Sequence, residues 1–535
     1  MVNSGNKQID PEATGGGWRQ NDWKFKQSKQ GSPLWVCRKS QLRSSLPHRA
    51  KQRLTFAVAE DRVSIRALKW LIPMEQRDTG RLIEKGQTLL EDKPDLIAAK
   101  AASQAQRRFS GDDLAPWAWT EPSVWTNSML ATLSDNSVRA GKWHSLMDKV
   151  HRQPNLYSAY REVAANKGAA GVDNITIEDF TARLVRNIDK LEEQLRDGSY
   201  VPQAIKRVHI PKPGTTETRP LGIPTVRDRV VQNALRHVIE PILERQFAEH
   251  SYGFRPNRGC KDALRRVDML VKKGYKYTVD VDLKSYFDTI PHDRLITELR
   301  KYVADNSVID LVAKFLRANV LDGMDSWTPV SGAPQGAIIS PLLSNLYLND
   351  LDHAMAQAGY EMTRYADDLV IQCPTRAEAE AALEMVRRWT TERGLTLHPT
   401  KTKIVNVDEE GFEFLGYRFI KHRRFPRRKS MEKFKETIRS KTPRTNGNSL
   451  QAIITDVNRT LRGWFEYFKH SWRTTFPELD SWIRMRLRSI LRKRAGRRGK
   501  GRGLDHHRYP NSLFGELGLF DMTTAHARQC QPCFK

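Results

Sequence analysis

Two groups of aspartates are the residues whose types and spacing could do chemistry. Asp367 and Asp368 are adjacent in RYADDLV (364–370), where the flanking residues are typical of a strand. Asp280 and Asp282 lie two residues apart in VDVDLKSYFD (279–288), so on a strand they point to the same face. Carboxylates this close repel one another unless something positive lies against them. Mg²⁺ prefers oxygen ligands, and two ions about 4 Å apart can stabilise the attacking and leaving oxygens of a phosphoryl displacement.

An isolated pair of aspartates is more often a capped turn than a metal site, so the elements around it matter. Strands that turn polar or enter a loop are predicted in residues 201–214 and 275–290, a hairpin with the two aspartates at its turn in 362–373, and helices in 230–247 and 341–355. Strands interleaved with helices across residues 200–420 predict an α/β or α+β domain.

The composition indicates a partner with negative charge. The chain has 535 residues, which is too long for one ordinary domain, and a net charge of +27 with a pI near 9.9. Proteins this basic usually bind a polyanion, most often nucleic acid. No apolar run is long enough to span a bilayer, and the polar N-terminus lacks the apolar stretch of a signal peptide. We therefore expect a cytoplasmic protein with no membrane partner.

The five cysteines do not form a disulfide framework in a chain of this size, which also indicates a reducing compartment. Cys530 and Cys533 form a single CxxC near the end of the chain. Without a second pair or a histidine cluster, we do not expect this chain to form a complete zinc site there.

Residues 421–510 carry most of the positive charge, with 26 Lys and Arg against 7 Asp and Glu, a net charge of +19. Two stretches in this region have helical periodicity. Their apolar faces are predicted to contain Leu461, Trp464, Phe465 and Phe468 in the first, and Ile483, Leu487 and Ile490 in the second, with the arginines outward. A solvated basic helix is the alternative, but so much charge on amphipathic helices favours RNA or DNA binding.

The aspartate motif resembles the palm of reverse transcriptases, and further blocks extend the resemblance to the group II intron reverse transcriptases. These blocks are NKGAAGVD, RPLGIPTVRDRVVQNAL, HSYGFRPNRGC, VDVDLKSYFDTIPHDRL, GAPQGAIISPLLSNLYLNDLD, RYADDLV, LTLHPTKTKI and GFEFLGYRF. Ala366 fits the group II intron branch. The later basic region, with GWFEYF and GLDHHRYPNSLFGELGLF, resembles the maturase or thumb region of that family, so the resemblance covers about residues 141–526.

The resemblance implies a set of site residues. Asp282 and Asp367 are expected to bind two Mg²⁺ ions, for which Mn²⁺ could substitute, with Asp368 as a supporting carboxylate and Asp280 and Asp288 as structural residues. The remaining positions would bind the nucleotide or act on it: Lys212 and Arg219 on the triphosphate, Phe287 under the sugar to select deoxynucleotides, Gln335 beside the nascent base pair, and Lys401 as the acid for the leaving pyrophosphate. The simpler interpretation of Phe287 is a core phenylalanine. The simpler interpretation of the segment from Lys212 to Arg219 is a solvated loop.

The resemblance also implies the architecture. We expect an α+β right-hand polymerase, with fingers and palm in residues 141–425, an α-helical basic thumb or maturase domain in 426–526, and a tail in 527–535. Residues 1–140 would be an extension, either an accessory RNA-binding domain or a partly disordered segment. The paired CxxC motifs of the endonuclease that many relatives carry are missing, so we expect an endonuclease-lacking form.

The implied function is that of an RNA-directed DNA polymerase that also binds its intron RNA as a maturase, to assist splicing and mobility. Its partners would be group II intron RNA, an RNA template with a DNA or RNA primer, target DNA and dNTPs, and the family allows a homodimer. Two alternatives stay open at this point. One is a non-catalytic RNA-binding splicing factor, and the other is a domesticated reverse transcriptase in DNA repair or phage defence.

Overall fold

The computed structural model describes residues 23–27, 33–37, 116–135, 141–211 and 218–530. The chain divides into two compact units, Met1–Gln104 and Ala105–Lys535. In the first unit, the described residues form one antiparallel pair, β1 (Trp23–Gln27) with β2 (Pro33–Cys37). The rest of the predicted extension before residue 116, and Cys533 of the predicted CxxC, lie outside the described residues.

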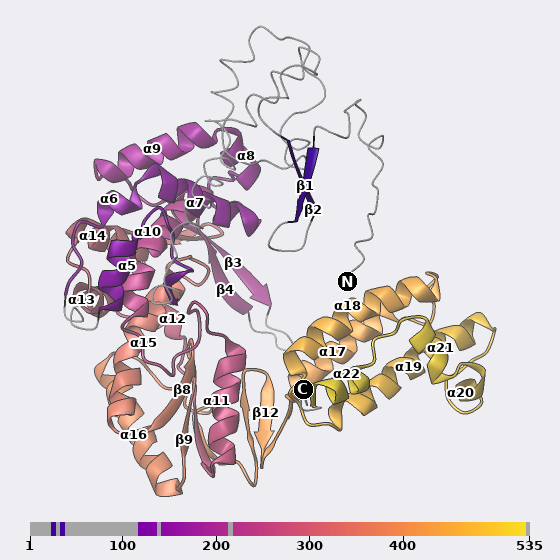
Figure 1. Ribbon diagram of the computed structural model, residues 1–535. Helices are drawn as coiled ribbons and strands as arrows, with labels where there is room; N and C mark the ends of the chain where they lie inside the picture. The colour runs from indigo at the N-terminus through magenta and orange to yellow at the C-terminus, as the bar shows by residue number, and fades with distance from the viewer. Residues whose placement is uncertain (1–22, 28–32, 38–115, 136–140, 212–217, 531–535) are drawn as a thin grey trace, which may run out of the picture. The chain divides into compact units, whose positions relative to one another are not determined.

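A four-stranded antiparallel sheet holds the aspartates, with strand order β10-β5-β9-β8. The strands are β5 (Tyr277–Val281), β8 (Glu361–Tyr365), β9 (Asp368–Cys373) and β10 (Lys403–Asn406). Helix α11 (Cys260–Lys272) packs on one face, and α15 (Ser340–Gln357) and α16 (Arg376–Glu392) pack on the other (Figure 1). Because both faces are covered, the middle of β9 is apolar, and Leu369, Val370 and Ile371 are all buried.

A second four-stranded sheet has the order β4-β3-β6-β7, with β3 and β6 parallel and the other pairs antiparallel. Its strands are β3 (Ile205–Pro211), β4 (Thr218–Ile223), β6 (Val320–Asp322) and β7 (Asp325–Trp327). The helices of this part of the chain are α5 (Asn127–Ser134), α6 (Met147–Val150), α7 (Gln153–Ala165), α8 (Ile177–Ala182), α9 (Leu184–Arg196), α10 (Val226–Glu244), α12 (Tyr286–Thr289), α13 (His292–Arg300) and α14 (Asn306–Leu316). Helix α10 is buried around most of its surface, as expected of a central core helix.

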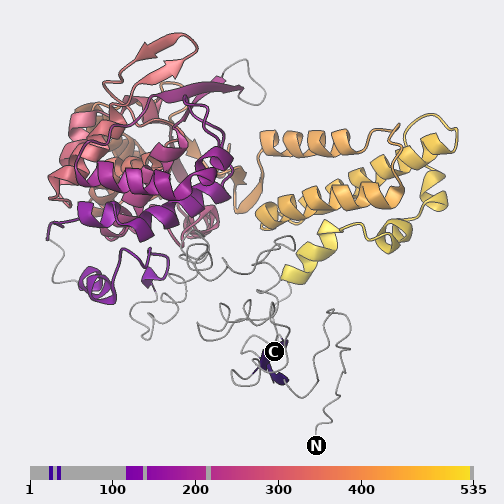
Figure 2. The ribbon, with the colours of Figure 1, turned by 90° about the horizontal axis from the view of Figure 1, so that it is seen from above.

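A three-stranded antiparallel sheet follows, with order β11-β12-β13: β11 (Phe412–Phe414), β12 (Tyr417–Ile420) and β13 (Arg423–Pro426). The basic region beyond it is helical: α17 (Arg428–Lys441), α18 (Leu450–Phe468), α19 (Thr475–Arg494), α20 (Asp505–Arg508), α21 (Asn511–Glu516) and α22 (Met522–Cys530). Figure 2 shows α17 and α18 lying alongside one another. No described helix is both long enough and apolar enough to cross a membrane.

The expected apolar faces of the basic helices are confirmed, since Leu461, Phe465, Ile483, Leu487 and Ile490 belong to one buried core. The expectation that the arginines of α19 all point outward is wrong for Arg488. Its side chain is 1% exposed and donates to the backbone oxygen of Tyr509 and to Asn511 Oδ1. The α+β fold class with a helical basic domain is confirmed.

Candidate active site

The structure brings three predicted carboxylates to one end of the four-stranded sheet. Tyr365 pairs with Asp368 across the β8–β9 hairpin, so Ala366 and Asp367 form its turn and Asp368 begins β9. Val281, the last residue of β5, pairs with Leu369. Asp282 therefore leaves β5 immediately beside Asp368.

Burial and the neighbouring carboxylates raise the pKa values of the aspartates at this end of the sheet. Burial raises the pKa of Asp367, and the charge of Asp282 adds to the rise. The surrounding protein raises the pKa of Asp368 to about 6, together with the charges of Asp367 and Asp282. Burial also raises the pKa of Asp280 to about 6, with Lys403 opposing and the charges of Asp368 and Asp282 adding to the rise. A cation bound among these groups would favour their ionised forms.

The donor set suits a hard divalent cation that is completed by a substrate. The described residues contain no group of three or more His, Cys, Asp or Glu side chains that could by itself hold a metal ion. Mg²⁺ is commonly held by one or two carboxylates together with water and substrate phosphates, and not in a protein cage. Asp282, Asp367 and Asp368 would hold such an ion.

Lys401 lies at the same carboxylates. Its Nζ is 3.2 Å from Asp282 Oδ2, and the lysine side chain is 61% exposed. The segment that carries it is fixed to the strand end, because the His398 backbone N–H donates to the Asp282 backbone oxygen at 2.7 Å. The exposed lysine could therefore leave Asp282 without disturbing the backbone, and its role as a proton donor stays a prediction.

Three of the four predicted nucleotide-binding residues lie in the described part of the chain. The charge of Arg219, on β4, opposes the rise in the pKa of both Asp367 and Asp368, so its guanidinium lies within electrostatic reach of them. Phe287 and Gln335 line one cavity of about 290 Å³. The backbone oxygen of Gln335 accepts from Gly222 N, which ties this loop to β4. Lys212 lies outside the described residues.

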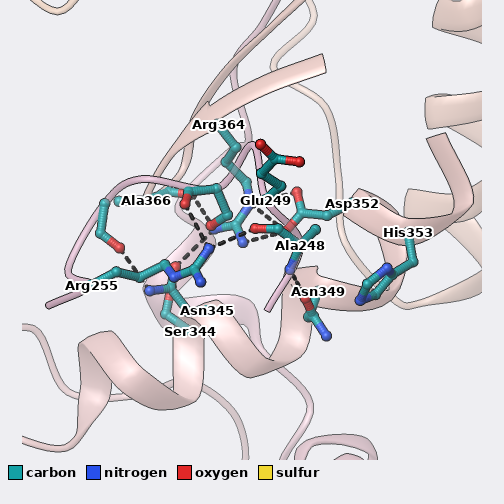
Figure 3. Close-up of polar contacts among 12 residues, drawn as sticks. Ala248, Glu249, Arg255, Ser344, Asn345, Asn349, Asp352, His353, Arg364 and Ala366 are labelled. Atoms are coloured by element: carbon teal, nitrogen blue, oxygen red, sulfur yellow. Dashed lines mark hydrogen bonds and ion pairs between the residues drawn. The ribbon is translucent and has the colours of Figure 1, made fainter. Parts of the chain in front are cut away.

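A buried ion pair lies beside the aspartate turn and supports it (Figure 3). Arg364 is 0% exposed, and its Nε lies 2.8 Å and 3.1 Å from the carboxylate oxygens of Asp352 on α15. Its Nη1 donates to Asn345 Oδ1 and to the backbone oxygen of Ala366. The second of these bonds reaches the turn directly, and Ala366 has a φ of +59°, a left-handed conformation that non-glycine residues seldom adopt. The guanidinium thus holds the strained residue that precedes Asp367.

Sequence reasoning missed this support. Its signal was present on α15, where Asn345, Asn349 and Asp352 recur every three or four residues among leucines that must be buried. Polar residues at helical spacing on a buried face require partners. Asn349 has them in the backbone of Ala248 and Gln246, and Asn345 Nδ2 donates to the backbone oxygen of Gly253 at 2.7 Å.

Two family models match separate parts of the chain. Residues 210–419 match the model described as reverse transcriptase (RNA-dependent DNA polymerase). Residues 431–509 match the model described as group II intron, maturase-specific domain. The first match covers the aspartates, Arg219, Phe287, Gln335 and Lys401, and the second covers most of the basic helical region.

Known proteins match across these regions. Protein YkfC of Escherichia coli is 33% identical over 362 residues, which are 60% of this chain and 89% of that protein. The group II intron-encoded protein LtrA of Lactococcus lactis is 36% identical over 221 residues, 41% of this chain and 36% of that protein. The COX1/OXI3 intron 1 protein of Saccharomyces cerevisiae is 27% identical over 417 residues, 67% of this chain and 49% of that protein. This chain therefore spans most of the first relative but half or less of the other two.

Proposed function

Because the chain belongs to the family of group II intron reverse transcriptases and maturases, we propose that it is an RNA-directed DNA polymerase that also binds intron RNA as a maturase. The observation that carries the polymerase proposal is the crowding of Asp282, Asp367 and Asp368 at one end of the sheet, which follows from the pairing of Val281 with Leu369 and of Tyr365 with Asp368. Such crowding is costly unless cations and substrate phosphates offset it.

The proposed reaction joins a primer 3′-hydroxyl to the α-phosphate of a dNTP. Two Mg²⁺ ions, when bound, would supply Lewis acidity to the attacking and leaving oxygens. Arg219 would donate to the triphosphate, where negative charge develops. Phe287 would exclude a 2′-hydroxyl, and Gln335 would contact the new base pair. Lys401 would leave Asp282 and give a proton to the departing pyrophosphate.

The maturase proposal depends on the basic helices. Their apolar side chains pack together in one core. The lysine and arginine side chains on the other faces would bind a polyanion. A structured intron RNA would be held mainly through its backbone and shape.

Primer extension on poly(rA) with an oligo(dT) primer, Mg²⁺ and dTTP tests the polymerase proposal. We expect the native protein to extend the primer and Asp367→Asn to lose extension. Asp293→Asn serves as the matched control, because that side chain is 94% exposed on α13, outside the expected metal-binding set.

The outcome also separates the alternatives. If the native protein does not extend while it binds structured RNA tightly, the polymerase proposal fails and the non-catalytic splicing factor takes its place. If it extends but shows no preference for any group II intron RNA over other structured RNA, the maturase proposal fails and a domesticated reverse transcriptase remains.

A further inference from the structure

Phe254 is an exposed aromatic residue between buried neighbours. Its side chain is 50% exposed, whereas Gly253 and Arg255 on either side are buried. Its φ is +56°, a conformation that is unusual for a bulky residue and persists only where the surroundings enforce it. Single exposed hydrophobic residues are common, but a strained one held out of the core by its neighbours requires a reason.

Buried polar groups enforce this conformation from both sides. Asn345 Nδ2 donates to the backbone oxygen of Gly253 at 2.7 Å. After Phe254, the Arg255 guanidinium pairs with Glu244 at the end of α10 and donates to the backbone oxygens of Ala248 and Ser251. Figure 3 shows Asn345 bonded to Arg364, with Arg255 close by. The ring of Phe254 is therefore displayed by a rigid loop.

The loop also touches the aspartate turn. A Cβ added to Gly253 would lie 2.2 Å from the backbone nitrogen of Ala366, so the two backbones are in direct contact. Ser251 continues the sheet order one step beyond β8 through a bridge to Arg364. Going across the sheet, Asp282 at the end of β5 comes first, the turn between β9 and β8 second, and the loop of Phe254 last.

A cavity of about 550 Å³ lies beside the ring. Its apolar lining includes Trp119, Ile338, Pro341 and Leu342. Its ionisable lining side chains are Glu121, Glu162, Arg236, His237, Glu240 and Arg255. Because three acids offset the two arginines and the histidine, this lining has no excess of positive charge and does not suit a phosphate. It suits the uncharged part of a nucleotide, the sugar and the base.

We propose that Phe254 contacts the template RNA strand of the primer–template duplex, packing its ring against the sugar and base of one nucleotide. This inference rests on the proposed polymerase function. The primer end and the dNTP must meet the metals between Asp282 and the turn. The loop on the other side of the turn then faces the opposite strand, which is the template.

Binding measured without catalysis tests the contact. Fluorescence anisotropy in EDTA gives the Kd of an RNA–DNA duplex for the native protein, Phe254→Ala and Phe254→Tyr. We expect Kd to rise about tenfold in Phe254→Ala, as for loss of one aromatic contact to a nucleotide, and to change less than twofold in Phe254→Tyr. Met324→Ala is the matched control, because Met324 is fully exposed on the β6–β7 hairpin and carries no strained backbone. An unchanged Kd in Phe254→Ala overturns the proposal.

Photocrosslinking of the native protein identifies the strand and needs no substitution. A duplex with 5-iodouridine in the template is compared with one that carries 5-iododeoxyuridine in the primer, and crosslinked peptides are sequenced. Crosslinking of Phe254 to the template supports the proposal, whereas crosslinking only to the primer, or to neither strand, overturns it. Because both measurements omit dNTPs, failure of primer extension would refute the polymerase function without deciding this contact.

Discussion

Arg364 places a positive charge beside the aspartate turn, and its side chain is fully shielded from water. Burying two charges is expensive, and their attraction repays the cost only with good geometry and additional hydrogen bonds. Arg364 meets these conditions, because it bonds Asp352, Asn345 and the turn itself. Removing one partner would leave the other charge buried and alone.

We therefore predict that Arg364→Met lowers the free energy of unfolding by about 3–5 kcal/mol, measured by urea denaturation. The double substitution Arg364→Met with Asp352→Leu should recover much of that loss, since no charge is left unpaired. If the single and double variants are equally destabilised, packing rather than charge accounts for the effect.

The contact between Gly253 and the aspartate turn leads to a second prediction. Gly253→Ala would place its Cβ against Ala366, where backbone and not a flexible side chain must move. We expect kcat for primer extension to fall at least tenfold while most of the fold is retained, as judged by circular dichroism. Gly447→Ala is the control, because a Cβ there meets nothing within 4 Å and, as at Gly253, φ lies outside the left-handed range. Equal loss of kcat in both variants would contradict the prediction.

Among the elements, the positions of helices could be predicted from periodicity, but the residues that contact those helices could not. The sequence predicts a helix in residues 341–355, and α15 covers 340–357. The groups that satisfy its polar residues lie on β8 and in the loops after α10, so no local pattern reveals them. Arg488 was misjudged for the same reason, because its partners Tyr509 and Asn511 lie about 20 residues later, at the end of α20 and the start of α21. The strand pattern around the aspartates was legible, because it is local.

The packing of α7 against α10 predicts a pH dependence. Glu162 of α7 is partly buried, but the hydrogen bond and charge of His237 on α10, with Asn233 and Arg236, lower its pKa from 4.5 to about 2. The unfolded chain therefore binds more protons than the folded protein between these pH values. The stabilisation is complete above about pH 4.5 and is lost as the pH falls towards 2.

Urea denaturation at pH 7 and pH 3 measures this loss of folding stability. We expect the stability of the native protein to fall more between these pH values than that of Glu162→Gln. Glu178→Gln, an exposed change on α8, should follow the native protein. Identical acid sensitivity in Glu162→Gln would show that the pair with His237 does not contribute.

For the whole molecule, charge distribution is the property that the sequence reveals most directly. The net charge of +19 in residues 421–510 is visible without a structure. The structure adds that the connection after α19 is folded rather than loose. Arg492 pairs with Asp505 at 2.7 Å and donates to the backbone oxygen of Arg498, while Arg497, Arg498 and Lys500 remain exposed.

Each phosphate contact contributes roughly 0.7–0.9 to the slope of log K against log salt. We predict that changing Arg497, Arg498 and Lys500 to Gln reduces the magnitude of that slope by about 2–3 for structured RNA, measured by filter binding across a salt series. Changing Arg376, Arg387 and Arg388 on α16 to Gln removes the same charge elsewhere. Equal effects of the two triple variants would mean that binding responds to total charge and not to this connection.

Helix α18 joins two regions that serve different ligands in our proposals. Its first turn follows the loop whose Asn446 and Asn448 oxygens accept from Arg494 of the basic region. Its last turn bonds the β11–β12 hairpin, where Tyr417 Oη donates to the Tyr467 oxygen at 2.6 Å and Tyr467 Oη donates to the Leu415 oxygen at 2.7 Å. A helix of 19 residues, roughly 28 Å long, thus connects the basic region, which we propose binds intron RNA, with the β11–β12 hairpin at the end of the proposed polymerase region. If the two binding events are coupled through α18, thermodynamic linkage requires that each ligand change the affinity of the other by the same factor. The splicing partner and the polymerase substrate would then regulate one another reciprocally.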